Sequence, residues 1–305
     1  MYDLIIIGGG PAGTAAGVYA SRKQLKTLFV TNDWGGQSIV SPDIQNWIGT
    51  PSISGDQLAK DLEGHLRAYA GEWVEIKDKT EVTNIEKVDE GSTVHFKNGE
   101  SAAARAVLIA TGSKRRRIEA DNADTLEHKG LTYCATCDGP IFSGQDVAVI
   151  GGGNAAFETA AQLLAYTKSV TLLNRSDSYK ADPVTVEKVL SHENMTAITG
   201  AVPKAILGEK FVSGMTYTKD GEEKQLDVTG IFVEIGMIPN TDFIGDAAKL
   251  DDYGRVEIDP WTQQTTTPGI WAAGDCTNIK YHQNNISAGD AVRALEDIYV
   301  HLRAK

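Results

Sequence analysis

The chain has 305 residues and a net charge of −12, and 41% of its residues are hydrophobic while 23% are charged. This length predicts two domains, each with a buried core. The acidic balance argues against nucleic acid as a partner, because proteins that neutralise phosphates need the opposite charge.

The N-terminal residues predict a βαβ unit. Leu4–Ile7 is a continuous apolar run ended by glycines, which is typical of a strand buried on both faces of a parallel sheet. An alanine-rich helix is expected over Gly13–Arg22, and the next strand over Lys26–Thr31. The short apolar run lacks the basic flank of a signal peptide, and no stretch approaches the ~20 residues of a membrane helix. The cytoplasm is therefore the expected location, with no membrane partner.

The same βαβ pattern recurs in the middle of the chain. Short strand-like runs over Glu75–Phe96 and a buried strand over Ala106–Ala110 precede it. The second unit comprises a strand at Asp146–Ile150, a helix at Asn154–Tyr166 and a strand at Ser169–Leu173. A duplicated unit of this kind predicts two dinucleotide-binding domains.

The second half continues the alternation of strands and helices. A β-hairpin is expected over Phe211–Val228, and buried strands are expected over Gly230–Ile235 and Gly269–Ala273. A final helix is expected over Ile286–Leu302. The fold class is therefore α/β, with two Rossmann-like, doubly wound, three-layer domains.

The domain boundaries are expected at the basic stretch Lys114–Arg117 and in the region Pro239–Gly245. They divide the chain into a discontinuous first domain, residues 1–113 and 245–305, and an inserted second domain, residues 114–244. Each of the two βαβ units falls in a different one of these domains.

The first glycine loop has the spacing Gly8-x-Gly10-x-x-Gly13, between a predicted strand and a predicted helix. Glycines allow a tight turn and let the backbone approach a pyrophosphate, which the helix N-terminus attracts. The acidic residue that usually binds a ribose is displaced here, since Asp33 comes late and Asn32 could take its place. That arrangement weakens a simple NAD interpretation of this loop.

Cys134 and Cys137 form a C-x-x-C motif immediately followed by Asp138. Such pairs cycle readily between dithiol and disulfide, and the adjacent carboxyl group could move protons. A zinc site would need two further ligands, and neither Cys276 nor any histidine lies at a ligand spacing, so no metal is expected. An inert structural pair is the other alternative.

The second glycine loop reads Gly151-x-Gly153-x-x-Ala156, the glycine/alanine variant of the fingerprint. Where an NADH-binding domain would carry a carboxylate, the following strand leads into Arg175 and Lys180. Cations at this place favour NADPH, because they can pair with its 2′-phosphate. The alternative is that both are solvated surface residues.

Together these motifs resemble the low-molecular-weight thioredoxin reductase family over essentially the whole chain. The resemblance is especially close to the flavoprotein portion of the alkyl hydroperoxide reductase F subunit. The motifs that carry it are Gly8–Gly13, Gly35-Gly36-Gln37, Ala110-Thr111-Gly112, Tyr133–Gly139, Gly151–Asn154 and Ala272–Cys276.

The resemblance implies two sets of cofactor-binding residues. FAD would contact Gly8, Gly10, Pro11, Ala12, Gly13, Thr31, Asn32, Gly36, Gln37, Asn46, Ala110, Thr111, Gly112, Gly274, Asp275, His282 and Gln283. NAD(P)H would contact Gly151, Gly153, Asn154, Ala155, Asn174, Arg175, Ser176 and Lys180.

The family also implies a role for each catalytic residue. Cys137 would face the flavin, Cys134 would exchange with the partner disulfide, and Asp138 would be the acid/base. Ser176 and Lys180 stand where thioredoxin reductases carry further arginines, so NADPH is favoured over NADH while NADH stays open. The thioredoxin-fold domains of the F subunit have no counterpart in these residues, so the electron acceptor would be a separate protein.

The predicted function is an FAD-dependent thioredoxin-disulfide reductase that passes electrons from NAD(P)H to a thioredoxin-like or glutaredoxin-like protein, as a homodimer. Three alternatives remain. The first is the same reductase with a different donor such as ferredoxin, the second is a dithiol oxidase, and the third is a non-catalytic redox-sensing flavoprotein.

Overall fold

The structure, a computed structural model, describes residues 1–41 and 43–303, apart from the side chains of Val40, Thr136 and Cys137. The chain forms two compact units, one made of Met1–Lys114 with Ile238–Lys305 and the other of Arg115–Met237. Each unit is an α/β structure with a parallel sheet, which confirms the predicted fold class.

The chain passes between the units at β7 (Ser113–Arg115) and β16 (Met237–Pro239), which pair with each other. The second crossing therefore comes earlier than the expected division at residues 244 and 245. The reason is that Asn240 already belongs to the first unit, where its carbonyl oxygen accepts a hydrogen bond from the Thr111 hydroxyl at 2.7 Å.

The first unit is built on one seven-stranded sheet with the order β3-β2-β1-β6-β5-β4, and β17 also pairs with β6. The central pairs are parallel, whereas β4 and β5 extend the sheet in antiparallel fashion. The strands are β1 (Tyr2–Gly9), β2 (Thr27–Trp34), β3 (Val74–Lys77), β4 (Val82–Val88), β5 (Gly91–Phe96), β6 (Ser101–Ile109) and β17 (Ile270–Ala272).

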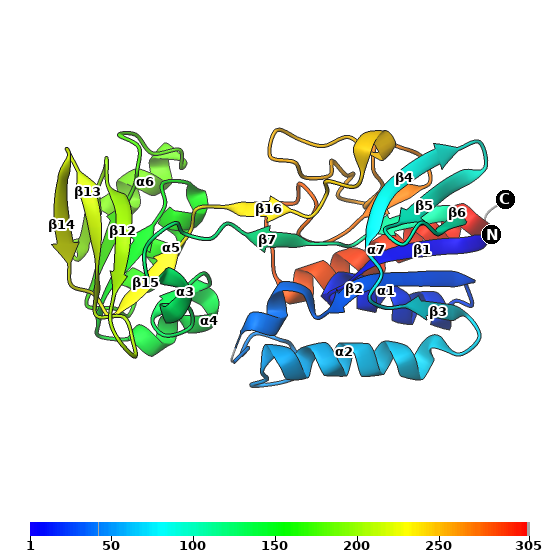
Figure 1. Cartoon of the computed structure of the whole chain (residues 1–305), viewed down its shortest axis with the longest axis horizontal. Helices are drawn as coiled ribbons and strands as arrows, with labels where there is room; N and C mark the ends of the chain where they lie inside the picture. The colour runs from blue at the N-terminus through cyan, green and yellow to red at the C-terminus, as the bar shows by residue number, and fades with distance from the viewer. Residues whose placement is uncertain (42, 304–305) are drawn as a thin grey trace. The chain divides into compact units, whose positions relative to one another are not determined.

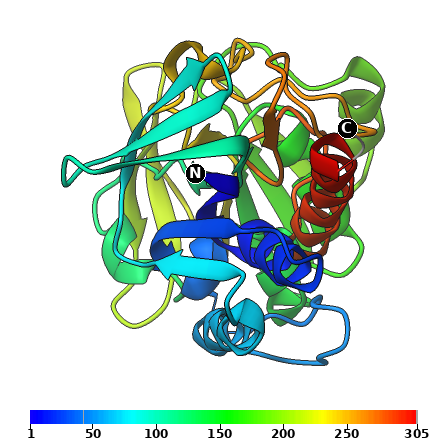
Figure 2. The same cartoon turned by 90° about the vertical axis from the view of Figure 1, so that its right-hand side faces the viewer.

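Helices cover one face of this sheet. They are α1 (Pro11–Arg22), α2 (Gly55–Ala70) and α7 (Asn284–Arg303), and α1 and α7 lie side by side in Figure 2. Leu4 and Ile6 point into this helical layer, while Ile5 and Ile7 point into the opposite core. Both faces are buried, which explains the uninterrupted apolar run. Short 3₁₀ turns are η1 (Gly36–Val40) and η3 (Gly245–Ala247).

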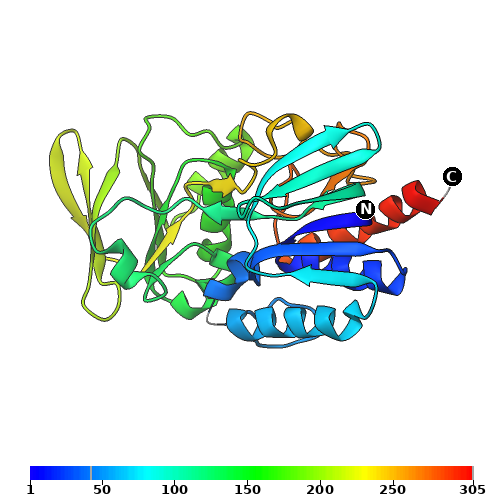
Figure 3. The ribbon, with the colours of Figure 1, turned by 45° about the vertical axis from the view of Figure 1, so that its right-hand side comes forward.

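The second unit contains a parallel sheet with the order β11-β10-β9-β15-β8 and a separate antiparallel sheet, β12-β13-β14 (Figures 1 and 3). The strands of the parallel sheet are β8 (Leu131–Thr132), β9 (Asp146–Ile150), β10 (Ser169–Leu173), β11 (Met195–Ile198) and β15 (Gly230–Val233). Those of the antiparallel sheet are β12 (Val202–Leu207), β13 (Gly214–Lys219) and β14 (Glu222–Leu226).

The two faces of this parallel sheet are covered differently. Val147 and Val149 pack against α5 (Asn154–Leu164), and the other face packs against the antiparallel sheet through residues such as Met215. The remaining elements are α3 (Ala123–Leu126), α4 (Ala135–Asp138), η2 (Gly139–Phe142) and α6 (Pro183–Leu190). Within residues 1–41 and 43–303, no helix has both the length and the apolar character that a membrane span requires.

Candidate active site

The first glycine loop closes tightly onto the end of β6. Gly8 has a φ of +123°, and a Cβ there would overlap the carbonyl oxygen of Ala110. A Cβ at Gly13 would overlap the carbonyl oxygen of Gly8. Helix α1 begins at Pro11, and Gly10 supplies no side-chain cap. The first N–H groups of the helix therefore remain available to an anionic ligand, as in dinucleotide-binding loops.

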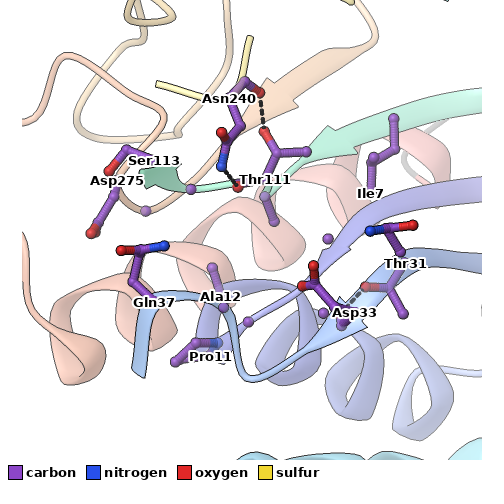
Figure 4. Close-up of a pocket in the computed structure, with 18 of the residues that line it drawn as sticks. Ile7, Pro11, Ala12, Thr31, Asp33, Gln37, Thr111, Ser113, Asn240 and Asp275 are labelled. Atoms are coloured by element: carbon purple, nitrogen blue, oxygen red, sulfur yellow. Dashed lines mark hydrogen bonds between the residues drawn. The ribbon is translucent and has the colours of Figure 1, made fainter. Parts of the chain in front are cut away.

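A cavity of about 660 Å³ opens over this loop. Figure 4 shows Gln37 and Asp275 toward one end of it, and Thr31 and Asp33 toward the other. Most of the predicted FAD residues line it, namely Gly8, Gly10, Pro11, Ala12, Thr31, Asn32, Gly36, Gln37, Ala110, Thr111, Gly112, Gly274 and Asp275. Its volume lies within the range of about 300–1,000 Å³ that is usual for cofactor pockets.

The other predicted FAD residues lie outside the lining of this cavity. Gly13 supports the loop from behind. The Asn46 amide donates to the Gln283 side-chain oxygen at 3.0 Å, so the structure brings these two together. His282 has its Nε2 3.0 Å from the carbonyl oxygen of Ile279.

Ser113 and Asn240 are among the polar lining residues that were not predicted from the sequence. Ser113 is 2% exposed, and its hydroxyl has no hydrogen-bond partner among the described residues. Asn240 donates its amide to the carbonyl oxygen of Thr111 at 3.0 Å, a bond drawn in Figure 4. Ser113 directly follows the Ala110–Gly112 motif and could have been inferred, but Asn240 comes from a distant segment.

The lining residues fit a flavin dinucleotide. The glycine loop and the start of α1 suit a pyrophosphate, and the unpartnered Ser113 hydroxyl suits a polar ligand atom. Asp275 accepts a hydrogen bond from the Ser287 hydroxyl at 2.9 Å, which fixes the orientation of its carboxylate at the cavity wall.

The second unit gathers three features at one edge of its parallel sheet. Strands β9, β15 and β8 are neighbours and run parallel, so their carboxyl ends lie at the same edge. The glycine loop follows β9, Glu234 follows β15, and Cys134 follows β8. The chain order reverses between β9 and β15, and ligands of open α/β sheets bind at such switch points.

Asn174, at the end of β10, is 5% exposed and organises the loop beside the second glycine motif. Its amide nitrogen donates to the carbonyl oxygens of Ser176 and Ser178, each at 2.9 Å. The Lys180 backbone N–H donates to the carbonyl oxygen of Gly152 at 2.8 Å. The loop is thus held against the glycine motif, in the position from which a Rossmann domain contacts the adenosine ribose.

The remaining predicted nucleotide residues are mostly solvent-facing. The side chains of Arg175, Ser176 and Lys180 are at least partly exposed, as are Asn154 and Ala155 at the start of α5. Exposed cations are consistent with both interpretations, namely ligands for a 2′-phosphate or solvated surface residues.

The redox motif is organised by a residue that was not predicted from the sequence. Cys134 is disulfide-bonded, whereas the predicted role of Cys137 concerns a side chain outside those described. Thr132, at the end of β8, is 4% exposed. Its hydroxyl accepts a hydrogen bond from the Cys134 N–H at 3.2 Å and donates one to the Asp138 carboxylate. Thr132 therefore joins the backbone of Cys134 to Asp138, the predicted acid/base.

Replacing Thr132 by valine is expected to slow disulfide exchange at Cys134 about tenfold or more, because a hydrogen bond to a charged group contributes about 1.5–3 kcal/mol. Thr132→Ser retains the hydroxyl and should stay within about twofold of wild type. The measurement is the single-turnover rate of disulfide exchange, with thermal unfolding monitored in parallel. Equal rates for the valine and serine variants would contradict the role given to the hydroxyl.

Glu234 is a further residue that was not predicted from the sequence. It is partly buried, and the Thr159 hydroxyl donates to its Oε1 at 2.9 Å. Burial raises the pKa of Glu234 to about 7, against the opposing effects of the Thr159 hydrogen bond and the positive charge of Arg115, while Glu158 adds to the rise. A lone carboxyl group inside the apolar run 230–235 was a visible signal, since such groups are seldom buried without a reason.

Glu234→Gln is expected to stabilise the second unit at high pH. The pKa of Glu234 is raised in the folded state from an ordinary 4.5 to about 7, so folding opposes ionisation. The resulting loss of stability begins near pH 4.5, grows until pH passes 7, and reaches at most about 3 kcal/mol. Urea unfolding at pH 4.5 and pH 8 measures it: the variant should gain stability at pH 8 only. An equal gain at both pH values would contradict the assignment.

Cys276 is fully buried, and burial raises the pKa of its thiol to about 11. A thiol that stays protonated at neutral pH is a poor nucleophile and a poor metal ligand. Among the described side chains, which do not include that of Cys137, no three histidine, cysteine or acidic residues are grouped to hold a metal ion.

Comparisons with known proteins agree with this geometry. A family model described as pyridine nucleotide-disulphide oxidoreductase matches residues 2–289. The F subunit of alkyl hydroperoxide reductase from Staphylococcus aureus is 38% identical over 295 residues, which is 96% of this chain and 57% of that protein. NADH dehydrogenase of Bacillus subtilis is 35% identical over 295 residues, 96% of this chain and 57% of that protein. The chain thus spans little more than half the length of these relatives.

Among solved structures, thioredoxin reductase from Streptococcus pyogenes is 32% identical and superposes with a TM-score of 0.90, covering 100% of this chain and 99% of that one. The resemblance to low-molecular-weight thioredoxin reductases is confirmed over the full length. The fold, with two dinucleotide-binding units, is confirmed by the same superposition.

Proposed function

The chain belongs to the pyridine nucleotide-disulphide oxidoreductase family, and on that premise we propose that it is an FAD-dependent reductase of redoxin disulfides. Electrons would pass from NAD(P)H to the Cys134–Cys137 pair, and from this pair to a thioredoxin-like or glutaredoxin-like protein. The observation that carries the proposal is the shared edge of the second unit, where the glycine loop after β9 and the cysteine motif after β8 flank one strand.

The first unit supplies the proposed flavin site. Bound FAD would supply two-electron chemistry, taking a hydride from the nicotinamide and reducing a disulfide. The loop from Gly8 to Gly13 would hold the pyrophosphate, and Asp275, oriented by Ser287, would hold the ribityl–phosphate region. Three further residues that do not line the cavity would contact the flavin, namely Asn46, His282 and Gln283.

The disulfide exchange proceeds in two steps. The Cys134 thiolate attacks one sulfur of the partner's disulfide, a mixed disulfide forms, and the second partner sulfur leaves as a thiolate. The Cys137 thiolate then attacks the Cys134 sulfur, the Cys134–Cys137 disulfide forms, and the mixed disulfide breaks. The partner sulfur leaves as a thiolate, and protonation gives the partner dithiol. Asp138, held by Thr132, provides or accepts the proton that each change of thiol ionisation requires.

NADPH is the proposed donor, in preference to NADH. Arg175 and Lys180 belong to the loop that packs on the glycine motif, and from there they would reach a 2′-phosphate. Asn174 stands where a carboxylate would repel that phosphate. A homodimer and a cytoplasmic location remain predictions from the sequence.

Thiol counting tests the proposal. The FAD-loaded protein is mixed anaerobically with NADPH, and thiols are titrated before and after mixing with a coloured disulfide reagent. One pair of reactive thiols should appear, while buried Cys276 should stay unreactive in the folded chain. Catalytic reduction of an added thioredoxin should follow. Absence of new thiols would contradict the electron path.

A further inference from the structure

We propose that Glu234 is part of the nicotinamide-nucleotide site and that its carboxyl group must be protonated for tight dinucleotide binding. The inference rests on the proposed function, because it assigns a residue to the donor site of the second unit.

The position of Glu234 is fixed by the strand order. It is the first residue after β15, the strand between β9 and β8. Its backbone N–H donates to the carbonyl oxygen of Ile150 at 2.8 Å, and a Cβ on Gly151 would overlap its carbonyl oxygen. Glu234 therefore packs directly against the first glycine of the phosphate-binding loop, at the switch point of the sheet.

Two charged groups of opposite sign act on the carboxyl group of Glu234. From α5, the Thr159 hydroxyl binds one carboxyl oxygen, and Glu158 adds a second negative charge nearby. From β7, Arg115 contributes a positive charge that favours ionisation. A dinucleotide brings the two negative charges of its pyrophosphate to the adjacent loop, where a third fixed negative charge in a partly desolvated site is unfavourable.

A neutral carboxyl group avoids that repulsion and can donate a hydrogen bond to the ligand. Burial raises the pKa of Glu234 to about 7. A small free-energy preference of the bound dinucleotide for the neutral carboxyl group is therefore enough to protonate it near neutral pH. By linkage, dinucleotide binding should take up a proton, and affinity should fall as the pH rises through 7.

The test is the Kd of NADH and of NADPH from pH 6 to pH 8, measured by fluorescence with the FAD-loaded wild type and with Glu234→Gln. If only the protonated form binds, the wild-type Kd should rise about tenfold over this range for a group titrating near pH 7. NADH is needed beside NADPH, because a phosphate monoester such as the 2′-phosphate itself titrates near pH 6. Glu234→Gln keeps an acceptor for Thr159 and cannot ionise, so its Kd for NADH should be constant.

Glu158→Gln is the matched control, since it removes a neighbouring carboxylate that is exposed. It should retain the pH dependence with a lower midpoint, because loss of its charge makes Glu234 easier to ionise. A pH-independent wild-type Kd, or a Glu234→Gln variant with the wild-type pH dependence, would overturn the inference and leave the proposed function standing. Failure of both nucleotides to bind at any pH would instead overturn the nicotinamide donor of the proposed function.

Discussion

Cys134→Ser should reduce the rate of redoxin reduction by about 10³-fold or more, while NADPH still bleaches the bound flavin at close to the wild-type rate. A serine hydroxyl cannot form the mixed disulfide, so exchange with the partner loses its nucleophile, and losses of this size are usual when a nucleophile is removed. The glycine loops and the cavity of the first unit are untouched by the substitution. Steady-state reduction of thioredoxin and stopped-flow absorbance measure the two activities separately.

Cys276→Ala is the matched control for this experiment. Cys276 is fully buried, and its thiol lies 3.5 Å from the carbonyl oxygen of Ala273 in the first unit, whereas the redox motif belongs to the second unit. Redoxin reduction per folded protein should stay within about twofold of wild type, since no step uses this thiol. If Cys134→Ser lost both flavin reduction and redoxin reduction, the roles assigned to the cysteine pair would be wrong.

The second large effect is expected for Gly13→Ala, which should weaken FAD binding about 10²-fold. A Cβ at residue 13 would overlap the carbonyl oxygen of Gly8, and both atoms belong to the backbone of one tight loop. The loop must shift, and backbone strain of about 2–3 kcal/mol corresponds to that loss of affinity. Flavin fluorescence during dilution of the loaded protein gives the Kd.

Substitutions at two other glycines distinguish distortion of the glycine loop from the general effect of placing alanine in a helix. Gly64 lies within α2 with no atom within 4 Å of the position of its Cβ, so Gly64→Ala should add about 0.5–1 kcal/mol of stability and leave FAD binding unchanged. Gly10→Ala places its methyl group 3.9 Å from the nearest protein atom, Cα of Gly36, beside the cavity. The Gly10→Ala variant should fold normally but bind FAD more weakly than the wild type. A Gly13→Ala variant with wild-type affinity would contradict the assignment of the loop.

The buried parallel strands could be predicted because their signal is local. Apolar runs such as Leu4–Ile7 and Asp146–Ile150, each closed by glycines, specify strands covered on both faces. Helix α2 was not predicted, although Ser54 caps it by accepting a hydrogen bond from the Gln57 N–H at 3.2 Å. Much of this helix is polar and exposed, so its apolar stripe is narrow and easily overlooked.

The position of the second crossing could not be predicted, because it depends on pairing between distant segments. Pro239 and Gly245 mark a break in the apolar pattern, but β16 ends at Pro239 and Asn240 already bonds to Thr111. Neither the end of β16 nor the bond between Asn240 and Thr111 can be inferred from the residues nearby in the sequence. The same limit explains why Asn240 was missed as a residue of the cavity lining.

The residues of the candidate site likewise fall into those that a sequence motif identifies and those that only the folded structure identifies. The loops and the C-x-x-C motif have fixed spacings, so residues such as Gly8, Gly151 and Cys134 were identified directly. Thr132 was missed because its hydrogen bonds to Cys134 and Asp138 depend on the path of the folded chain. Glu234 is visible as a carboxyl group in an apolar run, but its place beside the glycine loop comes from the order of β9, β15 and β8 in the sheet. That order is set by tertiary packing, and no spacing in the sequence reports it.

The most direct test of the central claim is anaerobic stopped-flow reduction of the FAD-loaded protein with NADPH and NADH in parallel. The proposed electron path predicts fast bleaching of the flavin absorbance by NADPH, with NADH slower, because Arg175 and Lys180 would bind the 2′-phosphate. Fast bleaching by NADH alone would contradict the NADPH assignment and leave the reductase intact. Bleaching by neither nucleotide would contradict the central claim, and the donor would then have to be ferredoxin or a dithiol.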